Sequence, residues 1–142
     1  MNKEQLGTIE MLSTTRKFAV GNDLVLLSEF KQSFNKLFEA KVYTESEIYY
    51  CNLFEDPMLR FAATWAAKEA VYKAIKQVDQ HSLSYKKIEI KRDKIGGIPN
   101  VILHHQAKPN FQISLSITHD GDYVWAIAIL EIHKNNPNLS LK

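Results

Sequence analysis

The sequence predicts a single α+β domain, with an antiparallel sheet packed on one long helix and shorter helices. The chain has 142 residues, of which 45% are hydrophobic, enough for one core and too few for two domains of ordinary size. Helical spacing of apolar residues dominates its first half, whereas alternating apolar and polar residues dominate its second half. Helices followed by strands favour the α+β class over alternating βα units.

The first expected strand covers residues 18–25, where a β-leaning run is interrupted by the polar pair Asn22 and Asp23. After it, the large apolar side chains recur at the spacing of one amphipathic helix. These side chains are Phe30, Phe34, Leu37 and Phe38.

Two further helices are indicated by their start signals. Residues 44–47, Thr-Glu-Ser-Glu, have the form of a capping box, which predicts a short helix. Asp56 followed by Pro57 is a strong N-terminal signal, and no Pro or Gly then occurs before about Gln77. We therefore expect the longest helix between Pro57 and Gln77.

Strands are expected at residues 87–91, 101–103, 111–117 and 123–132, with the Asp120-Gly121 pair making a hairpin between the last two. The predicted organisation is an N-terminal extension at 1–17, the domain at 18–133 and a flexible tail at 134–142.

Composition narrows the classes of function. Eighteen Lys and Arg against sixteen Asp and Glu leave a net charge of +2, too little to indicate a nucleic-acid binder. No apolar run approaches the roughly 20 residues of a membrane span, and the polar N-terminus does not resemble a signal peptide. The single cysteine, Cys51, can form no internal disulfide. We expect a cytoplasmic protein that binds neither nucleic acid nor membrane.

One row along the long helix combines aromatic and charged residues. Phe61, Trp65, Glu69 and Lys73 follow one another at intervals of four. A charge that continues an apolar row is costly unless it meets a partner, a metal or a ligand. The alternative is a simple Glu69–Lys73 salt bridge, worth about 0.3–0.5 kcal/mol.

Asp23 favours the metal interpretation, because aspartate is unfavourable inside an apolar strand. Asp23 and Glu69, with Lys68 and Lys73 nearby, form the kind of set that holds Mg²⁺ against a diphosphate. The alternative for Asp23 is a turn or bulge beside Gly21 and Asn22.

Five segments, in order and spacing, resemble the small 4′-phosphopantetheinyl transferases of the holo-[acyl-carrier-protein] synthase type. The similarity extends from about Val20 to Leu130, and the lysine-glutamate-alanine core downstream of a glycine-x-aspartate strand is its most specific part. The segments are Gly21-Asn22-Asp23-Leu24-Val25, residues 41–47, residues 65–74, Gly97-Ile98-Pro99, and residues 116–123.

The resemblance implies that phosphopantetheine is transferred from coenzyme A to a serine of an apo acyl carrier protein, with Mg²⁺ required and adenosine 3′,5′-bisphosphate released. It assigns catalysis to Asp23, Glu69 and Lys73. Asp23 and Glu69 would bind the metal, and Glu69 is our choice for taking the proton of the serine. The family is generally homotrimeric, with sites between subunits. The residues that would bind coenzyme A are Lys68, Lys73, Gly97, Pro99, Thr118 and His119.

Several positions depart from the family pattern. Asn22 replaces an apolar residue, Ile98 a basic one, and Lys41 an arginine, while Glu29 stands near the place of another arginine. These changes affect carrier docking most, and a pathway-specific carrier is one hypothesis. An alternative function is a degenerate relative that binds coenzyme A or a carrier without transfer.

Overall fold

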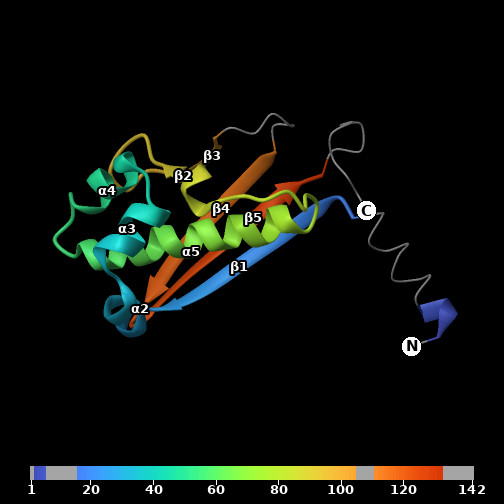
Figure 1. Ribbon diagram of the computed structural model, residues 1–142, viewed down its shortest axis with the longest axis horizontal. Coiled ribbons are helices and arrows are strands. Elements are labelled where there is room, and N and C mark those ends of the chain that lie inside the picture. The colour runs from blue at the N-terminus through green and yellow to red at the C-terminus, as the bar shows by residue number, and fades with distance from the viewer. Residues whose placement is uncertain (1, 6–15, 105–110, 133–142) are drawn as a thin grey trace.

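The computed structural model describes residues 2–5, 16–104 and 111–132. Its main sheet has three antiparallel strands in the order β1 (Phe18–Leu26), β5 (Tyr123–Glu131) and β4 (Gln112–Asp120). The long helix α5 (Pro57–Lys76) lies across one face of this sheet (Figure 1). Every second residue of β1 and β5 is buried there, as expected for strands with one face covered.

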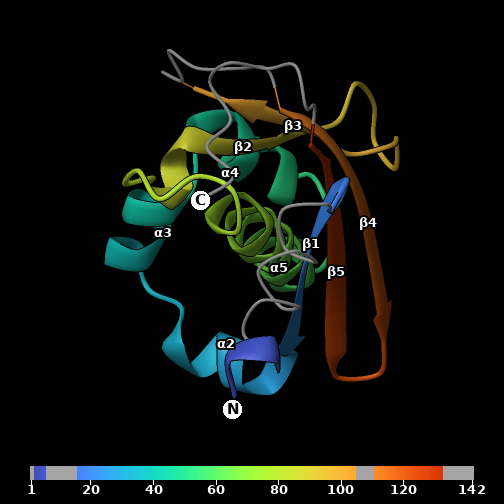
Figure 2. The same ribbon diagram turned by 90° about the vertical axis from the view of Figure 1, so that its right-hand side faces the viewer.

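The predicted antiparallel sheet is divided into two. β2 (Ile88–Lys91) pairs with β3 (Asn100–Leu103) in a separate two-stranded sheet, preceded by the short 3-10 helix η1 (Tyr85–Lys87). Figure 2 looks nearly along α5 and shows the main sheet on one side of that helix and the helix α3 (Lys36–Val42) on the other. The α+β class is confirmed, and α5 is the element on which the other layers pack.

β1 is regular through its polar pair. Its register with β5 runs without interruption from Phe18 opposite Glu131 to Leu26 opposite Tyr123, and Asp23 lies opposite Ala126. The alternative interpretation of Asp23, as part of a turn or bulge beside Gly21 and Asn22, is therefore wrong. Asp23 occupies an ordinary strand position on the face that α5 covers.

The single helix expected over the phenylalanine row is two helices, α2 (Leu27–Ser33) and α3 (Lys36–Val42). The chain is extended at Phe34 and Asn35, and the Asn35 side chain accepts a hydrogen bond from the Phe38 backbone N–H at 2.8 Å. Asparagine competes with helical backbone in this way, which favours a new helix start. The ring of Phe34 still packs on Phe61, with centroids 4.9 Å apart.

The other helix predictions are confirmed. Thr44 and Glu47 form the capping box of α4 (Glu45–Cys51), and Asp56 caps α5, with Pro57 in the first turn. Gly121 turns the hairpin between β4 and β5 with φ of 56°. Cys51 is fully buried.

The two ends of the domain lie side by side, since the Ile132 backbone N–H donates to the Lys17 carbonyl at 2.7 Å. The predicted tail at 134–142 and most of the predicted N-terminal extension lie outside the described residues. Within the described ranges, no helix is both long and apolar enough to cross a membrane.

The face of the main sheet opposite α5 carries large apolar side chains that remain exposed. They come from the two neighbouring strands β1 and β5 and therefore form one patch. We call this patch the open sheet face, and it comprises Phe18, Val20, Leu24, Tyr123, Trp125 and Ile129.

Candidate active site

The site begins with a close approach of α5 to β1. A Cβ atom on Gly21 would lie 1.9 Å from the Ala70 carbonyl oxygen and 2.7 Å from the Ala74 nitrogen. Only glycine fits between the strand and the helix backbone at this point. Because Asp23 follows two residues later, it faces the same turn of α5.

Asp23, Glu69 and Lys73 come together at this contact, as the sequence predicted. The Lys73 ammonium donates to Asp23 Oδ1 at 2.9 Å and to the Asn22 carbonyl at 3.1 Å. The predicted alternative, a helical Glu69–Lys73 salt bridge, is not among the ion pairs of the described residues, in which Lys73 pairs with Asp23 instead. The Asp23 side chain is 10% exposed and that of Lys73 is 52% exposed, so the cluster opens to solvent through the lysine.

The two carboxyl groups influence each other strongly. The pKa of Glu69 is raised to about 8, first because the group is partly buried and then because it meets the Asp23 carboxylate; Lys73 opposes this rise. Asp23 Oδ2 is buried and has no hydrogen-bond partner among the residues that the structure describes. A buried acceptor without a donor is costly, and so is a pair of adjacent negative charges. Both costs would be relieved by a cation between the carboxylates.

Aromatic rings form one wall of the cluster, which the sequence did not reveal. The Tyr85 ring packs on Trp65 and Tyr72, with centroids 4.8 and 5.0 Å away. Burial, and then the nearby charges of Glu69, Tyr72 and Asp23, raise the pKa of Tyr85. Tyr85 lies outside α5, and no spacing rule connects it with Glu69.

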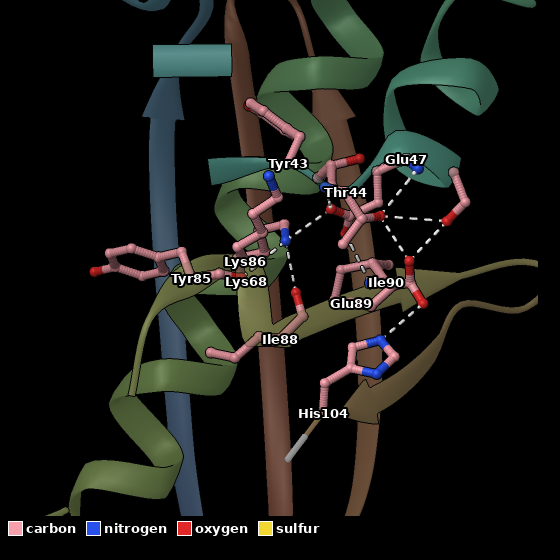
Figure 3. A network of polar contacts seen from close by, with 12 residues as sticks. Tyr43, Thr44, Glu47, Lys68, Tyr85, Lys86, Ile88, Glu89, Ile90 and His104 are labelled. Atoms are coloured by element: carbon pink, nitrogen blue, oxygen red, sulfur yellow. Dashed lines mark hydrogen bonds and ion pairs between the residues drawn. The ribbon is translucent and has the colours of Figure 1, made fainter. Parts of the chain in front are cut away.

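Lys68 lies elsewhere. Its side chain is fully buried, and Nζ forms an ion pair with Glu47 Oε1 at 2.7 Å while donating to the Tyr85 and Ile88 carbonyls (Figure 3). The structure therefore separates Lys68 from Lys73, although both were expected at the phosphates. Successive residues of a helix differ in direction by about 100°, which is why Lys68 and its neighbour Glu69 face different layers.

Glu47 and Glu89 form further polar contacts. The sequence predicted only a helix-capping role for Glu47 and no role for Glu89. Glu47 accepts from the Thr44 N–H and, through Oε2, from the Ile90 N–H, both at 2.8 Å. Glu89 accepts from Thr44 and Ser46 hydroxyls at 2.6 and 2.7 Å and lies 3.1 Å from His104 Nε2. Burial opposes ionisation of Glu89, but these hydrogen bonds outweigh it and lower its pKa to about 2.

The remaining predicted residues lie in two other places. Gly97 and Pro99 belong to the connection between β2 and β3, where the Gly97 N–H donates to the Lys94 carbonyl at 2.9 Å and a pocket of about 390 Å³ adjoins Gly97. Thr118 and His119 are exposed at the end of β4, and Thr118 pairs with Trp125 beside the open sheet face.

Residues 19–128 match the model of the 4′-phosphopantetheinyl transferase superfamily. The chain belongs to this superfamily. The match includes β1 with Asp23 and α5 with Glu69 and Lys73, and so covers the whole carboxylate cluster.

Individual relatives fall into two groups by length. A holo-[acyl-carrier-protein] synthase of Moorella thermoacetica is 34% identical over 119 residues, which are 78% of this chain and 91% of the relative. A fatty acid synthase subunit alpha of Candida parapsilosis is 37% identical over 133 residues, or 87% of this chain. The chain spans only 7% of the length of that fungal subunit.

Solved structures agree with the superfamily assignment. The chain is similar to an ACPS–CoA complex from Chronobacterium ammoniagenes, with a TM-score of 0.71, 25% identity, and coverage of 84% of this chain and 100% of that one. It is also similar to the acyl carrier protein synthase of Mycobacterium tuberculosis, with a TM-score of 0.63 and 32% identity over 81% of this chain and 97% of that one. The chain thus shares its fold with solved structures of acyl carrier protein synthases.

Proposed function

We propose that the protein transfers 4′-phosphopantetheine from coenzyme A to a serine hydroxyl of an apo acyl carrier protein and releases adenosine 3′,5′-bisphosphate. The main support for this proposal is the cluster of Asp23, Glu69 and Lys73, in which two carboxyl groups and one half-exposed ammonium converge at the contact of β1 and α5. Transfer of a phosphoryl group needs charge neutralisation and alignment more than covalent help from the protein.

The carboxylate pair fits Mg²⁺. Magnesium prefers oxygen ligands and is commonly held by one or two carboxylates together with phosphates of the substrate. Asp23 supplies a buried oxygen that has no donor among the described residues, and the pKa of Glu69 is raised by burial and then by Asp23. No group of three or more potential ligands is present among the described residues, so phosphate and water would complete the shell. When bound, the ion would neutralise phosphate oxygens.

The protein side chains would contribute charge and a proton acceptor. Lys73 is half exposed and could turn its ammonium from Asp23 towards a phosphate oxygen, as a flexible point charge. Glu69 would take the proton of the serine hydroxyl while the serine oxygen forms a bond to the phosphorus next to pantetheine. The bond from that phosphorus to the leaving bisphosphate then breaks.

We further propose a homotrimer in which the neighbouring subunit completes the site. The open sheet face is an exposed apolar area on two adjacent strands, which is typical of a protein–protein contact. Thr118 borders it, and His119 follows at the end of the strand. Gly97, Pro99, Thr118 and His119 would then approach the nucleotide from the subunit opposite Asp23 and Glu69.

The carrier partner is proposed to dock through local positive charge. Lys31, Lys36 and Lys41 are exposed on α2 and α3, whereas Glu29 is exposed on the same helix as Lys31. Acyl carrier proteins are acidic, so Glu29 would disfavour some carriers and select among them.

The direct test is the mass of the carrier. Purified protein with coenzyme A, Mg²⁺ and several apo carriers should add one phosphopantetheine to a carrier, seen by intact-mass spectrometry. Asp23→Ala and Glu69→Ala should abolish the addition because both remove a carboxylate of the cluster. Glu55→Gln, at an exposed carboxylate before α5, should leave it unchanged. Binding of coenzyme A without any mass shift would instead identify a degenerate relative.

A further inference from the structure

We propose that Lys68 is a positioning residue that fixes α5 and Tyr85 against β2, so that Glu69 faces Asp23, and that Lys68 does not contact coenzyme A. The inference rests on the proposed transfer reaction and concerns the residue beside its key carboxylate. It replaces the expectation that Lys68 neutralises phosphate.

All the donors of the Lys68 ammonium are occupied. An ammonium has three N–H donors. They meet Glu47 Oε1 at 2.7 Å, the Tyr85 carbonyl at 2.9 Å and the Ile88 carbonyl at 2.6 Å. The side chain has no exposed surface. A phosphate oxygen could reach Nζ only after one of these buried partners was lost.

Glu47 connects this ammonium to two other elements. One of its oxygens faces Lys68 and the Thr44 N–H at the start of α4, and the other accepts from the Ile90 N–H of β2 at 2.8 Å. Both Glu47 oxygens therefore have partners, and the Lys68–Glu47 ion pair is nearly inaccessible, with side-chain exposures of 0% for Lys68 and 1% for Glu47 (Figure 3). The pair joins α4, α5 and β2 at one point.

The same point controls the surroundings of Glu69 in two ways. Glu69 follows Lys68 on α5, so a rotation of the helix that displaced Lys68 would also turn Glu69 away from Asp23. Lys68 also holds the backbone of Tyr85, whose ring packs on Trp65 and Tyr72 at the wall of the cluster. On the opposite side, α5 is fixed by its close approach to Gly21. Gly21 and Lys68 therefore hold the helix between two sheets.

The experiment compares Lys68→Met with Lys73→Met, a matched loss of one ammonium one turn or so along the same helix. For Lys68→Met we expect the Kd of coenzyme A, measured by calorimetry without carrier and without Mg²⁺, to change by less than about twofold. We expect kcat of transfer to fall by about tenfold to a hundredfold, as a small displacement of a catalytic group causes. Lys73→Met, which removes the half-exposed ammonium, should weaken coenzyme A binding itself.

Affinity for Mg²⁺ alone gives a readout independent of transfer. A displaced Glu69 should raise the Mg²⁺ Kd of Lys68→Met by at least about fivefold. Glu47→Gln, which keeps an acceptor for Lys68, is the milder variant and should show the same pattern if Lys68→Met does not fold. The double variant Glu47→Gln/Lys68→Met should lose less than the product of the single losses, because neither change then leaves a buried charge alone.

The inference is overturned if Lys68→Met weakens coenzyme A binding about tenfold or more, as a phosphate ligand would. It is also overturned if a folded Lys68→Met keeps both kcat and Mg²⁺ affinity. A wild-type protein that transfers nothing to any carrier contradicts the proposed function instead, and the binding measurements still decide the role of Lys68.

Discussion

Lys68 and Lys73, five residues apart on α5, have opposite surroundings, because the side chain of Lys68 is fully buried whereas that of Lys73 is half exposed. The row of Glu69 and Lys73 could be predicted from spacing because it depends only on the helical period. The role of Lys68 could not, because it depends on Glu47, a residue of another helix that the sequence indicates only as part of a capping box. Burial and tertiary partners separate the two ammonium groups.

The carboxylate pair predicts a pH dependence of metal binding. Glu69, with a pKa of about 8, is protonated below that pH in the metal-free protein and must lose this proton to bind a cation. The affinity for Mg²⁺ should therefore rise by about tenfold per pH unit up to about pH 8 and then level off. Calorimetry of the intact protein in a series of buffers measures this directly.

Proton release provides the control for that measurement. At about pH 7, close to one proton should appear in the buffer for each Mg²⁺ bound, and above about pH 9 none should. Glu69→Gln should bind Mg²⁺ weakly with no such slope. A constant affinity across this range for the unaltered protein would show that the Glu69 carboxyl group does not titrate near pH 8.

At the scale of elements, the helix starts could be predicted because they depend on residues close together in the sequence. The capping box at Thr44 and the Asp56-Pro57 start of α5 are confirmed because each helix start satisfies its own backbone groups. The break between α2 and α3 was missed because the apolar spacing of Phe30 to Phe38 continues across it. The aromatic rings keep packing together after the break, with Phe30 and Phe38 centroids 6.0 Å apart, so periodicity alone does not reveal it.

The contact between β1 and α5 should not tolerate a methyl group. In Gly21→Ala the new Cβ would collide with the backbone at Ala70 and Ala74, and backbone cannot move aside as a side chain can. We expect a loss of about 1–3 kcal/mol or more in the free energy of unfolding, measured with urea. Transfer activity should fall as well, because Asp23 lies two residues further along β1.

Asn22→Ala is the comparison for this variant. Asn22 is exposed on the opposite face of β1, where its side chain accepts only a long bond of 3.4 Å from Trp125. Its unfolding free energy should change by no more than about 0.5 kcal/mol. Equal losses for the two variants would mean that Gly21 does not define the spacing of strand and helix.

For the whole molecule, composition predicted one core, but the sequence did not predict that the strands form two separate sheets. The Asp120-Gly121 pair predicts that residues 112–120 pair with 123–131. The strand patterns of residues 88–91 and 100–103 resemble those of the other two strands and do not indicate that they pair in a separate sheet. The near-neutral charge likewise gave no indication of the open sheet face, because alternating apolar residues predict a face without telling what covers it. Which strands pair, and what covers the open sheet face, depend on contacts between segments far apart in the sequence.

The open sheet face predicts that the protein self-associates and that a substitution introducing one charge on this face disrupts the association. Ile129→Lys places an ammonium on that face, on the central strand β5 and opposite Val20, and should weaken assembly by about a hundredfold or more. Light scattering after size-exclusion chromatography should give a trimer for the unaltered protein and a smaller species for the variant.

Leu37→Lys is the control, because Leu37 is 78% exposed on α3, away from the sheet. Its mass in solution should equal that of the unaltered protein. An unaltered protein that stays monomeric at high concentration would contradict the trimer. In that case Thr118 and His119 could not reach the nucleotide from a neighbouring subunit.

The pairing of β1 with β5 along their whole length has a consequence for how this fold can be carried by other proteins. Entry and exit of the chain are adjacent at Lys17 and Ile132, joined by a backbone hydrogen bond. A domain whose ends meet can be inserted in, or appended to, a much larger polypeptide without stretching either connection. The same architecture is thus suited both to proteins of about this length, such as the Moorella thermoacetica synthase, and to a small part of a much longer polypeptide, such as the Candida parapsilosis subunit.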